Sequence, residues 1–372
     1  MVPEFPPEIL ELYLDGTAVK ELSSSIGKVS SLIRLSLRNC SSLESLPSNL
    51  CNLTSLRKLD LSGLSNLTMV LEFPPEILKL FLDGTVVKEL SSSIGKVSSL
   101  IRLSLRNCSR LESLPSSLCN LTSLRQLDLS GSSNLKMVPE FPPEILELYL
   151  NGTAVKELSS SIGKVSSLIR LSLRNCLSLE SLPKAIDKLK SLKYLCMSGC
   201  SKLERLPDDL GKLESLEAIE ASGITVKELP SVMAVLSALQ FLKRLELNYC
   251  SITELPNNID NLPLLVDLEL EGNNFESIPT NIMNLSKLQS LNIRFCDRLQ
   301  SLPKLPRNIK ELLADGCKLL KELSGFTNLI TPGPDRRSLS LFNCVSLDWD
   351  AIRNILSDSI LDTYSSKINH FA

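Results

Sequence analysis

The sequence predicts an α/β solenoid, in which similar coils stack side by side and each adds one short strand to a parallel sheet. Leucine is the dominant residue, at 79 of 372 positions, and aromatic residues make up only 4% of the chain. A pattern L-x-x-L-x-L-x-x-(C/T/S) recurs along the chain. Residues 1–68, 69–136 and 137–204 are three copies of one block, so the chain is an array of repeats.

Each pattern begins with a strand whose apolar side chains alternate inward. Leu35-Ser36-Leu37 and Leu268-Glu269-Leu270 show this alternation, and the recurring spacing requires the strands to stack in parallel. After the strand, apolar residues such as Leu43 and Leu50 are interrupted by Pro47, which favours a turn and a short helical or 3₁₀ segment over a second strand. We expect the sheet on the concave face of a horseshoe and these segments on its convex face.

The ninth position of the pattern carries a small residue that we expect to be buried in the turn. This pattern is the signature of the leucine-rich repeat, which usually places asparagine there. The residues at this position are Thr17, Cys40, Thr85, Cys108, Thr153, Cys176, Cys200, Cys250, Cys296 and Cys317. Because they belong to successive coils and form no C-x-x-C pair, a metal or redox role is disfavoured.

The repeats predict a division of the chain into three parts. Residues 1–323 form a solenoid of about 14 coils, residues 324–338 form a loop, and residues 339–372 form the last strand and a helical cap. The cap is an amphipathic helix from Asp348 to Leu361, which either closes the solenoid or docks a partner. Residues 1–7 match the back half of an internal coil, so the chain is expected to start within a repeat.

Composition excludes several function classes. The net charge of −2 disfavours nucleic-acid binding, and no apolar stretch is long enough to enter a membrane. The only histidine is His370, so His-based catalytic triads and multi-histidine metal sites are excluded. There are 11 cysteines, an odd number, and most of them occupy one recurring repeat position instead of forming close pairs, which indicates reduced thiols. We therefore expect a non-enzymatic protein without a cofactor or metal, in the cytoplasm or nucleus.

Four segments carry a resemblance to a known family: EFPPEILELYLNGTAVKEL at 140–158, LKYLCMSGCSKLERLP at 192–207, LPKLPRNIKELLADGC at 302–317 and LFNCVSL at 341–347. They resemble the repeat region of plant immune receptors of the TIR, nucleotide-binding, leucine-rich-repeat type, over nearly the whole chain. The chain departs from that family at Ser23, Ser91 and Ser159, where proline is common. It contains neither a TIR nor a nucleotide-binding domain, and its nearest match to a phosphate loop, Ile26-Gly-Lys-Val29, lacks the required residues.

The resemblance implies a recognition module of plant innate immunity. Its partner would be a pathogen effector, a host protein that the receptor guards, or the nucleotide-binding domain of the parent receptor. Two alternatives remain open. Coils such as 255–262 and 278–285 also suit a free-standing intracellular scaffold or adaptor in signalling. Sequons headed by Asn52, Asn66, Asn120, Asn151 and Asn284 allow a cell-surface ectodomain, which the lack of a signal peptide disfavours.

A partner would contact the strand residues that alternate away from the core, where like positions of neighbouring strands form ladders. The predicted contact residues combine arginine with aromatic residues in the N-terminal blocks, and carboxylates in the later coils. They are Tyr13, Arg34, Arg38, Arg57, Phe81, Arg102, Arg106, Arg125, Tyr149, Arg170, Arg174, Glu220, Glu246 and Glu269. The alternative is a solvated face on which these arginines pair with Glu11, Asp60, Asp128 and Glu147.

Overall fold

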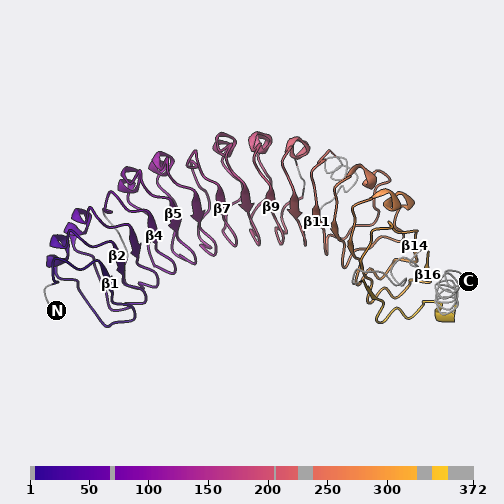
Figure 1. The fold of residues 1–372 in the computed structure, drawn as a ribbon, viewed down its shortest axis with the longest axis horizontal. Helices are drawn as coiled ribbons and strands as arrows, with labels where there is room; N and C mark the ends of the chain where they lie inside the picture. Colours follow the sequence, from indigo (N-terminus) through magenta and orange to yellow (C-terminus); the bar gives the residue numbers. More distant parts are fainter. Residues whose placement is uncertain (1–4, 68–71, 205–206, 225–237, 325–336, 351–372) are drawn as a thin grey trace, which may run out of the picture. The chain divides into compact units, whose positions relative to one another are not determined.

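A computed structural model describes residues 5–67, 72–204, 207–224, 238–324 and 337–350. The chain forms two compact units, unit 1 over residues 1–202 and unit 2 over residues 203–372. In each unit the coils lie side by side, with strands along one side and 3₁₀ turns along the opposite side (Figure 1). This arrangement confirms the predicted leucine-rich-repeat solenoid with a parallel sheet.

Unit 1 contains a parallel sheet whose strands follow the order of the chain. Each strand has three residues, and the central leucine is buried, as the alternating pattern predicted, in every strand except β1, where Leu12 is half-buried. The strands are β1 (Glu11–Tyr13), β2 (Arg34–Ser36), β3 (Lys58–Asp60), β4 (Lys79–Phe81), β5 (Arg102–Ser104), β6 (Gln126–Asp128), β7 (Glu147–Tyr149), β8 (Arg170–Ser172) and β9 (Tyr194–Cys196).

The segments opposite the strands of unit 1 are 3₁₀ helices of five residues. They are η1 (Ser24–Lys28), η2 (Ser48–Asn52), η3 (Ser92–Lys96), η4 (Ser116–Asn120), η5 (Ser160–Lys164) and η6 (Lys184–Lys188). Proline precedes η2, η4 and η6, where its fixed backbone angle suits the turn. At η1, Ser23 replaces proline and its hydroxyl accepts a hydrogen bond from the N–H of Ser25 at 3.2 Å. The departure from the family pattern therefore exchanges one helix cap for another.

Unit 2 repeats this architecture with one addition. Its main parallel sheet comprises β10 (Ala218–Glu220), β11 (Arg244–Glu246), β12 (Asp267–Glu269), β13 (Ser290–Asn292), β15 (Glu311–Leu313) and β17 (Ser338–Ser340). The 3₁₀ helices are η7 (Asp208–Lys212), η8 (Ile259–Asn261) and η9 (Thr280–Asn284). A second parallel sheet pairs β14 (Ser301–Leu302) with β16 (Glu322–Leu323). The expectation that no second strand follows the first is wrong for these coils. In unit 1 the same pairing is limited to single bridges, between Glu21 and Ser45 and between Glu89 and Ser113.

The cysteines and threonines at the ninth position bond to the backbone and, apart from the half-buried Thr17, are buried as expected. The thiol of Cys108 donates to the carbonyl of Leu82 at 3.1 Å, and the hydroxyl of Thr85 donates to the same carbonyl at 2.8 Å. In the coil with the usual residue, the amide nitrogen of Asn273 donates to the carbonyls of Leu247 and Leu270. Cysteine and threonine thus replace part of the asparagine network, and all 11 cysteines are free thiols.

The last described strand, β17, coincides with the strand predicted around residues 339–341. The predicted helix of residues 348–361 falls largely outside the described residues, as does most of the predicted loop of 324–338. In the part of the chain that the structure describes, no helix is both long and apolar enough to cross a membrane.

Candidate partner-binding face

The candidate site is the strand face, which we define as the surface formed by the first and third residues of each strand and the residues that flank them. Parallel register places equivalent positions next to one another, so Glu11, Arg34 and Lys58 are neighbours in one ladder. Arg34 forms an ion pair with Glu11 at 3.0 Å, and roughly half of each side chain remains exposed. The pair is open to solvent and weak, so both groups stay accessible to a partner.

Lysine and arginine side chains lie over aromatic rings on the strand face. Phe81 lies beneath the ammonium of Lys58 at 5.3 Å and the guanidinium of Arg102 at 5.5 Å, measured to the ring centroid. Arg170 lies over the ring of Tyr194 at 4.1 Å. These distances fit cation–π attraction, which holds the charged groups over the sheet. The arginines and Phe81 are among the predicted residues. Tyr194 is not, although its ladder position next to Arg170 identifies it.

Tyr13 and Tyr149 occupy the third position of β1 and β7, and each bonds to a carboxylate of its own strand. The hydroxyl of Tyr13 donates to Glu11 at 2.8 Å, and that of Tyr149 donates to Glu147 at 3.1 Å. Burial and the charge of Glu147 raise the pKa of Tyr149, so its hydroxyl remains a hydrogen-bond donor. Tyr13 is 55% exposed and offers its ring to solvent.

A second ladder follows the strands and contains Arg38, Arg106 and Arg174. Arg38 lies 3.9 Å from Asp60, and Arg106 lies 3.7 Å from Asp128. These contacts and the pair of Arg34 with Glu11 are ones that the solvated-face alternative predicted. The side chains of Arg38 and Arg106 are each more than half exposed, so the pairing leaves them available.

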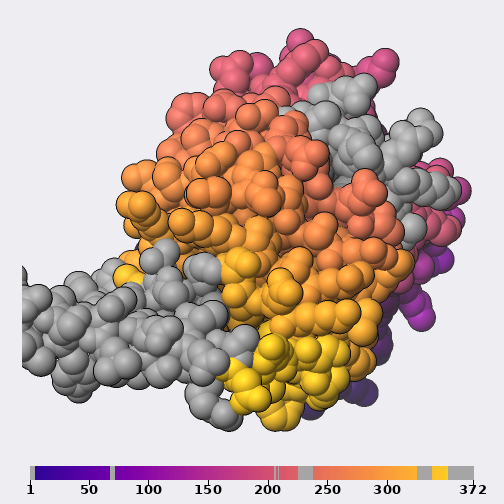
Figure 2. All heavy atoms as spheres, turned by 90° about the vertical axis from the view of Figure 1, so that its right-hand side faces the viewer, coloured from indigo at the N-terminus to yellow at the C-terminus, as the bar shows by residue number. Residues whose placement is uncertain are grey.

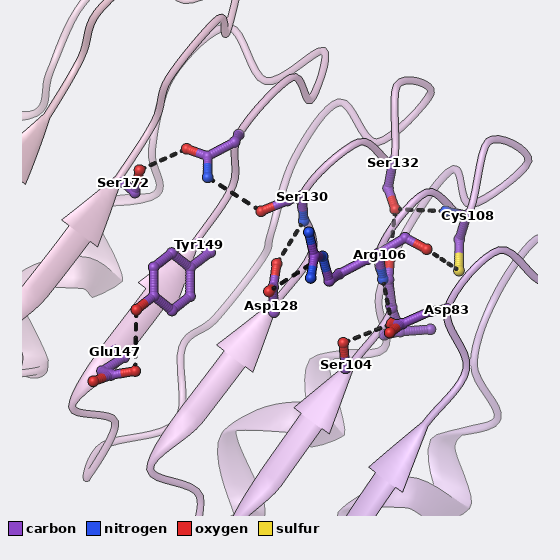
Figure 3. A network of polar contacts seen from close by, with 12 residues as sticks. Asp83, Ser104, Arg106, Cys108, Asp128, Ser130, Ser132, Glu147, Tyr149 and Ser172 are labelled. Carbon is purple, nitrogen blue, oxygen red and sulfur yellow. Dashed lines mark hydrogen bonds and ion pairs between the residues drawn. The ribbon is translucent and has the colours of Figure 1, made fainter. Parts of the chain in front are cut away.

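A polar network that the sequence analysis did not identify fixes the backbone of this second ladder (Figure 3). The carboxylate of Asp83 accepts hydrogen bonds from the hydroxyl of Ser104 at 2.6 Å and from the N–H of Arg106 at 2.8 Å. Asn151 makes the same two contacts to Ser172 and Arg174 in the third block. The recurring Leu-(Asp/Asn)-Gly-Thr segment was the available signal, because it places an acceptor at the same point of every block.

Arg57 and Arg125 play a different part from the other predicted residues. The guanidinium of Arg57 donates to the carbonyls of Thr54 at 2.9 Å and Glu76 at 3.4 Å, and Arg125 repeats these contacts with Thr122 and Glu144. Each arginine therefore ties its own coil to the next one. Their donors bond to backbone carbonyls, whereas Arg34 pairs with the carboxylate of Glu11, and Arg102 and Arg170 lie over aromatic rings.

The strand face of unit 2 carries carboxylates. Glu220, Glu246 and Glu269 lie in register at the third position of β10, β11 and β12. Burial and the charge of Glu220 raise the pKa of Glu246, although Arg244 forms an ion pair with it at 2.8 Å. Among the described residues no group of three or more His, Cys, Asp or Glu has the arrangement of a metal site. The three glutamates in register form the acidic ladder of unit 2.

The coils, the parallel strand ladder and the 3₁₀ turns define a leucine-rich-repeat protein, and family models agree. A model described as "Leucine-rich repeat region" matches residues 145–249, and one described as "Leucine Rich Repeat" matches residues 99–121. A solved leucine-rich-repeat protein of Leptospira interrogans shares the fold with a TM-score of 0.67 at 24% identity, covering 94% of this chain and 95% of that one.

Curated relatives narrow the class. A probable disease resistance protein of Arabidopsis thaliana is 36% identical over 95% of this chain. Two further proteins of the same plant also match. The disease resistance-like protein DSC1 is 33% identical over 73% of this chain, and the protein named SUPPRESSOR OF npr1-1, CONSTITUTIVE 1 is 38% identical over 48% of it. The chain spans only 20%, 19% and 14% of the lengths of these three relatives. It is a leucine-rich-repeat region of the kind found in plant nucleotide-binding disease resistance proteins.

Proposed function

We propose that this chain is a non-enzymatic recognition module of plant immunity, acting inside the cell in the cytoplasm or nucleus. Its strand face in unit 1 binds an acidic protein surface, which belongs to a pathogen effector, to a guarded host protein or to the nucleotide-binding domain of a parent receptor. In the last case the contact is autoinhibitory. The relatives' role in disease resistance supports the immune assignment.

The observation that carries the proposal is the recurrence of cations held over the sheet, of which Arg34 is exposed and Arg102 and Arg170 are half-buried. Arg34, Arg102 and Arg170 occupy the same position of three blocks, and two of them lie over aromatic rings. Arginine and aromatic residues are enriched among the residues that contribute most to protein interfaces. Repetition at intervals of three coils gives a partner several similar contacts along one surface.

The test is a triple charge reversal, with Arg34, Arg102 and Arg170 each changed to Glu. The matched control changes Lys28, Lys96 and Lys164 to Glu, which makes the same charge difference on exposed residues of η1, η3 and η5, opposite the strands. Binding to the nucleotide-binding domain of a related receptor, supplied as a separate chain, or to candidate effectors is measured by calorimetry. We expect the strand-face variant to lose at least tenfold in affinity and the control to retain it; equal affinities overturn the proposal.

A further inference from the structure

The last coils of unit 2 form a cavity of about 440 Å³ beside the carboxyl ends of their strands. Phe295 and Phe342 contribute its aromatic walls and Gly316 lies between their coils, while Glu271, Arg294 and Asp315 supply the charged groups. Figure 2 looks onto this end of unit 2, where residues 337–350 appear in yellow. All of its lining residues belong to unit 2, and none was among the predicted contact residues listed above.

The backbone at Phe295 departs from what its side chain prefers. Its φ is +55°, in the left-handed region, and Tyr249 has the same value two strands earlier. The equivalent positions of unit 1 carry Asn39, Asn107 and Asn175, a residue type that tolerates this conformation, whereas a bulky aromatic residue rarely adopts it. Strained residues of this kind concentrate at binding sites, where the surrounding structure holds them in place.

The neighbouring coil leaves room for the ring of Phe295. Gly316 has φ +75°, and a Cβ added there would lie 2.6 Å from a ring carbon of Phe295. Phe295 is 51% exposed and Phe342 is 81% exposed, although the hydrophobic effect favours burial of such rings. The glycine and the two exposed rings together make a preformed apolar slot rather than a part of the core.

The charges around the slot favour a cation. Arg294 and Asp315 neutralise each other across 2.8 Å. Asp315 is also held by the hydroxyl of Ser340 and the N–H of Phe342. Glu271 accepts hydrogen bonds from Tyr249 and Asn292, which are neutral, and no described residue forms an ion pair with it. The slot therefore carries one negative charge beside two aromatic rings.

We propose that this slot takes the side chain of an arginine on a protein partner, with the guanidinium against the rings of Phe295 and Phe342 and the charge of Glu271 as its counter-ion. A planar guanidinium stacks on aromatic faces and matches a carboxylate, which the compact and strongly hydrated ammonium of lysine does less well. The inference rests on the proposed function only in that a protein carries the arginine; the slot itself is tested without a protein partner.

The experiment titrates the 372-residue chain with N-acetyl-arginine methylamide and reads binding by saturation-transfer NMR. The citrulline analogue is the matched probe, because it keeps the shape and removes the charge, and the leucine analogue tests for apolar binding. We expect the arginine analogue to bind at least fivefold more tightly than citrulline, on the order expected for a cation–π contact. Equal binding of arginine and citrulline, stronger binding of leucine, or no binding of arginine overturns the proposal.

Three variants locate the binding. Phe342→Ala and Phe295→Asn should each abolish arginine binding, and the second places at that backbone the residue that unit 1 uses there. Phe241→Ala, at an aromatic residue that is 54% exposed and outside the cavity, should bind as wild type. The triple reversal of Arg34, Arg102 and Arg170 should also leave this binding unchanged, which separates a failure of the slot from a failure of the strand face of unit 1.

Discussion

Units 1 and 2 share one backbone turn, which carries only glycine or asparagine at the described strands of unit 1 and, besides glycine and asparagine, two aromatic residues in unit 2. Three residues after each strand the chain passes through a left-handed turn, at Gly63 and Asn107 in unit 1 and at Tyr249 and Phe295 in unit 2. Glycine and asparagine tolerate this conformation, whereas tyrosine and phenylalanine are strained in it. The three blocks of unit 1 therefore favour an unstrained turn, and unit 2 accepts strain at the coils where it presents aromatic rings. The difference indicates that the turns of unit 1 favour stability, whereas two turns of unit 2 are less stable and expose rings that a partner can contact.

The largest expected effect tests whether the cores of the two units are alike despite their different surfaces. Leu103 in β5 and Leu291 in β13 are the fully buried central residues of their strands. Changing either to Ala removes apolar contacts and leaves a cavity, so each variant should lose about 2–5 kcal/mol of local stability. Hydrogen exchange followed by mass spectrometry measures the loss, and we expect it to stay within the affected unit.

Ile101→Ala is the control for this comparison, because Ile101 precedes β5 and is 41% exposed. It should alter exchange far less than Leu103→Ala. Equal loss of protection in both units after either core substitution would contradict the expectation, since it would mean that the chain unfolds as one cooperative body.

A smaller effect tests the strain directly by exchanging the turn residues between the units. Phe295→Asn should raise the free energy of unfolding of its coil and Asn107→Phe should lower it, each by about 1 kcal/mol, because the left-handed conformation costs a bulky residue more than it costs asparagine. Denaturant unfolding followed by circular dichroism gives the sign, and hydrogen exchange assigns it to a coil. A loss of stability in Phe295→Asn would mean that the ring stabilises the fold and would contradict its assignment to binding.

The regular part of the fold follows from the sequence, and the contacts of individual side chains do not. Period and alternation predicted the strands, because the side chains of a strand alternate and Leu35, Leu103 and Leu171 recur at fixed spacing. They also predicted the arginine ladder. They did not predict that Arg57 binds backbone carbonyls while Arg34 stays exposed, since that depends on which main-chain groups the next coil leaves unpaired. The slot at Phe295 was not predicted either, because the sequence alone does not specify φ or the space above Gly316.

The smallest effect concerns the acidic ladder of unit 2 and its dependence on pH. Burial and the charge of Glu220 raise the pKa of Glu246 above its ordinary value. A carboxyl group with a raised pKa in the fold binds protons more readily there than in the unfolded chain. Its ionisation therefore lowers the free energy of unfolding as the pH rises from the unfolded pKa, about 4.3, through the folded one. Glu246→Gln removes this titration and should gain stability relative to wild type between pH 4 and pH 7.

The reference for this measurement is Glu112→Gln, the same substitution at an exposed carboxylate of unit 1. Denaturant unfolding of wild type and both variants is compared at pH 4 and pH 7, at low ionic strength to limit screening of the ladder. The gain should be larger for Glu246→Gln than for the reference. Salt should reduce the part of the gain that comes from repulsion by Glu220 and Glu269 and leave the part that comes from burial. If the free energies of unfolding of Glu246→Gln and wild type differ equally at both pH values, the effect comes from the lost contact with Arg244. The carboxylates of the ladder would then not repel one another, and a basic partner would gain nothing by neutralising them.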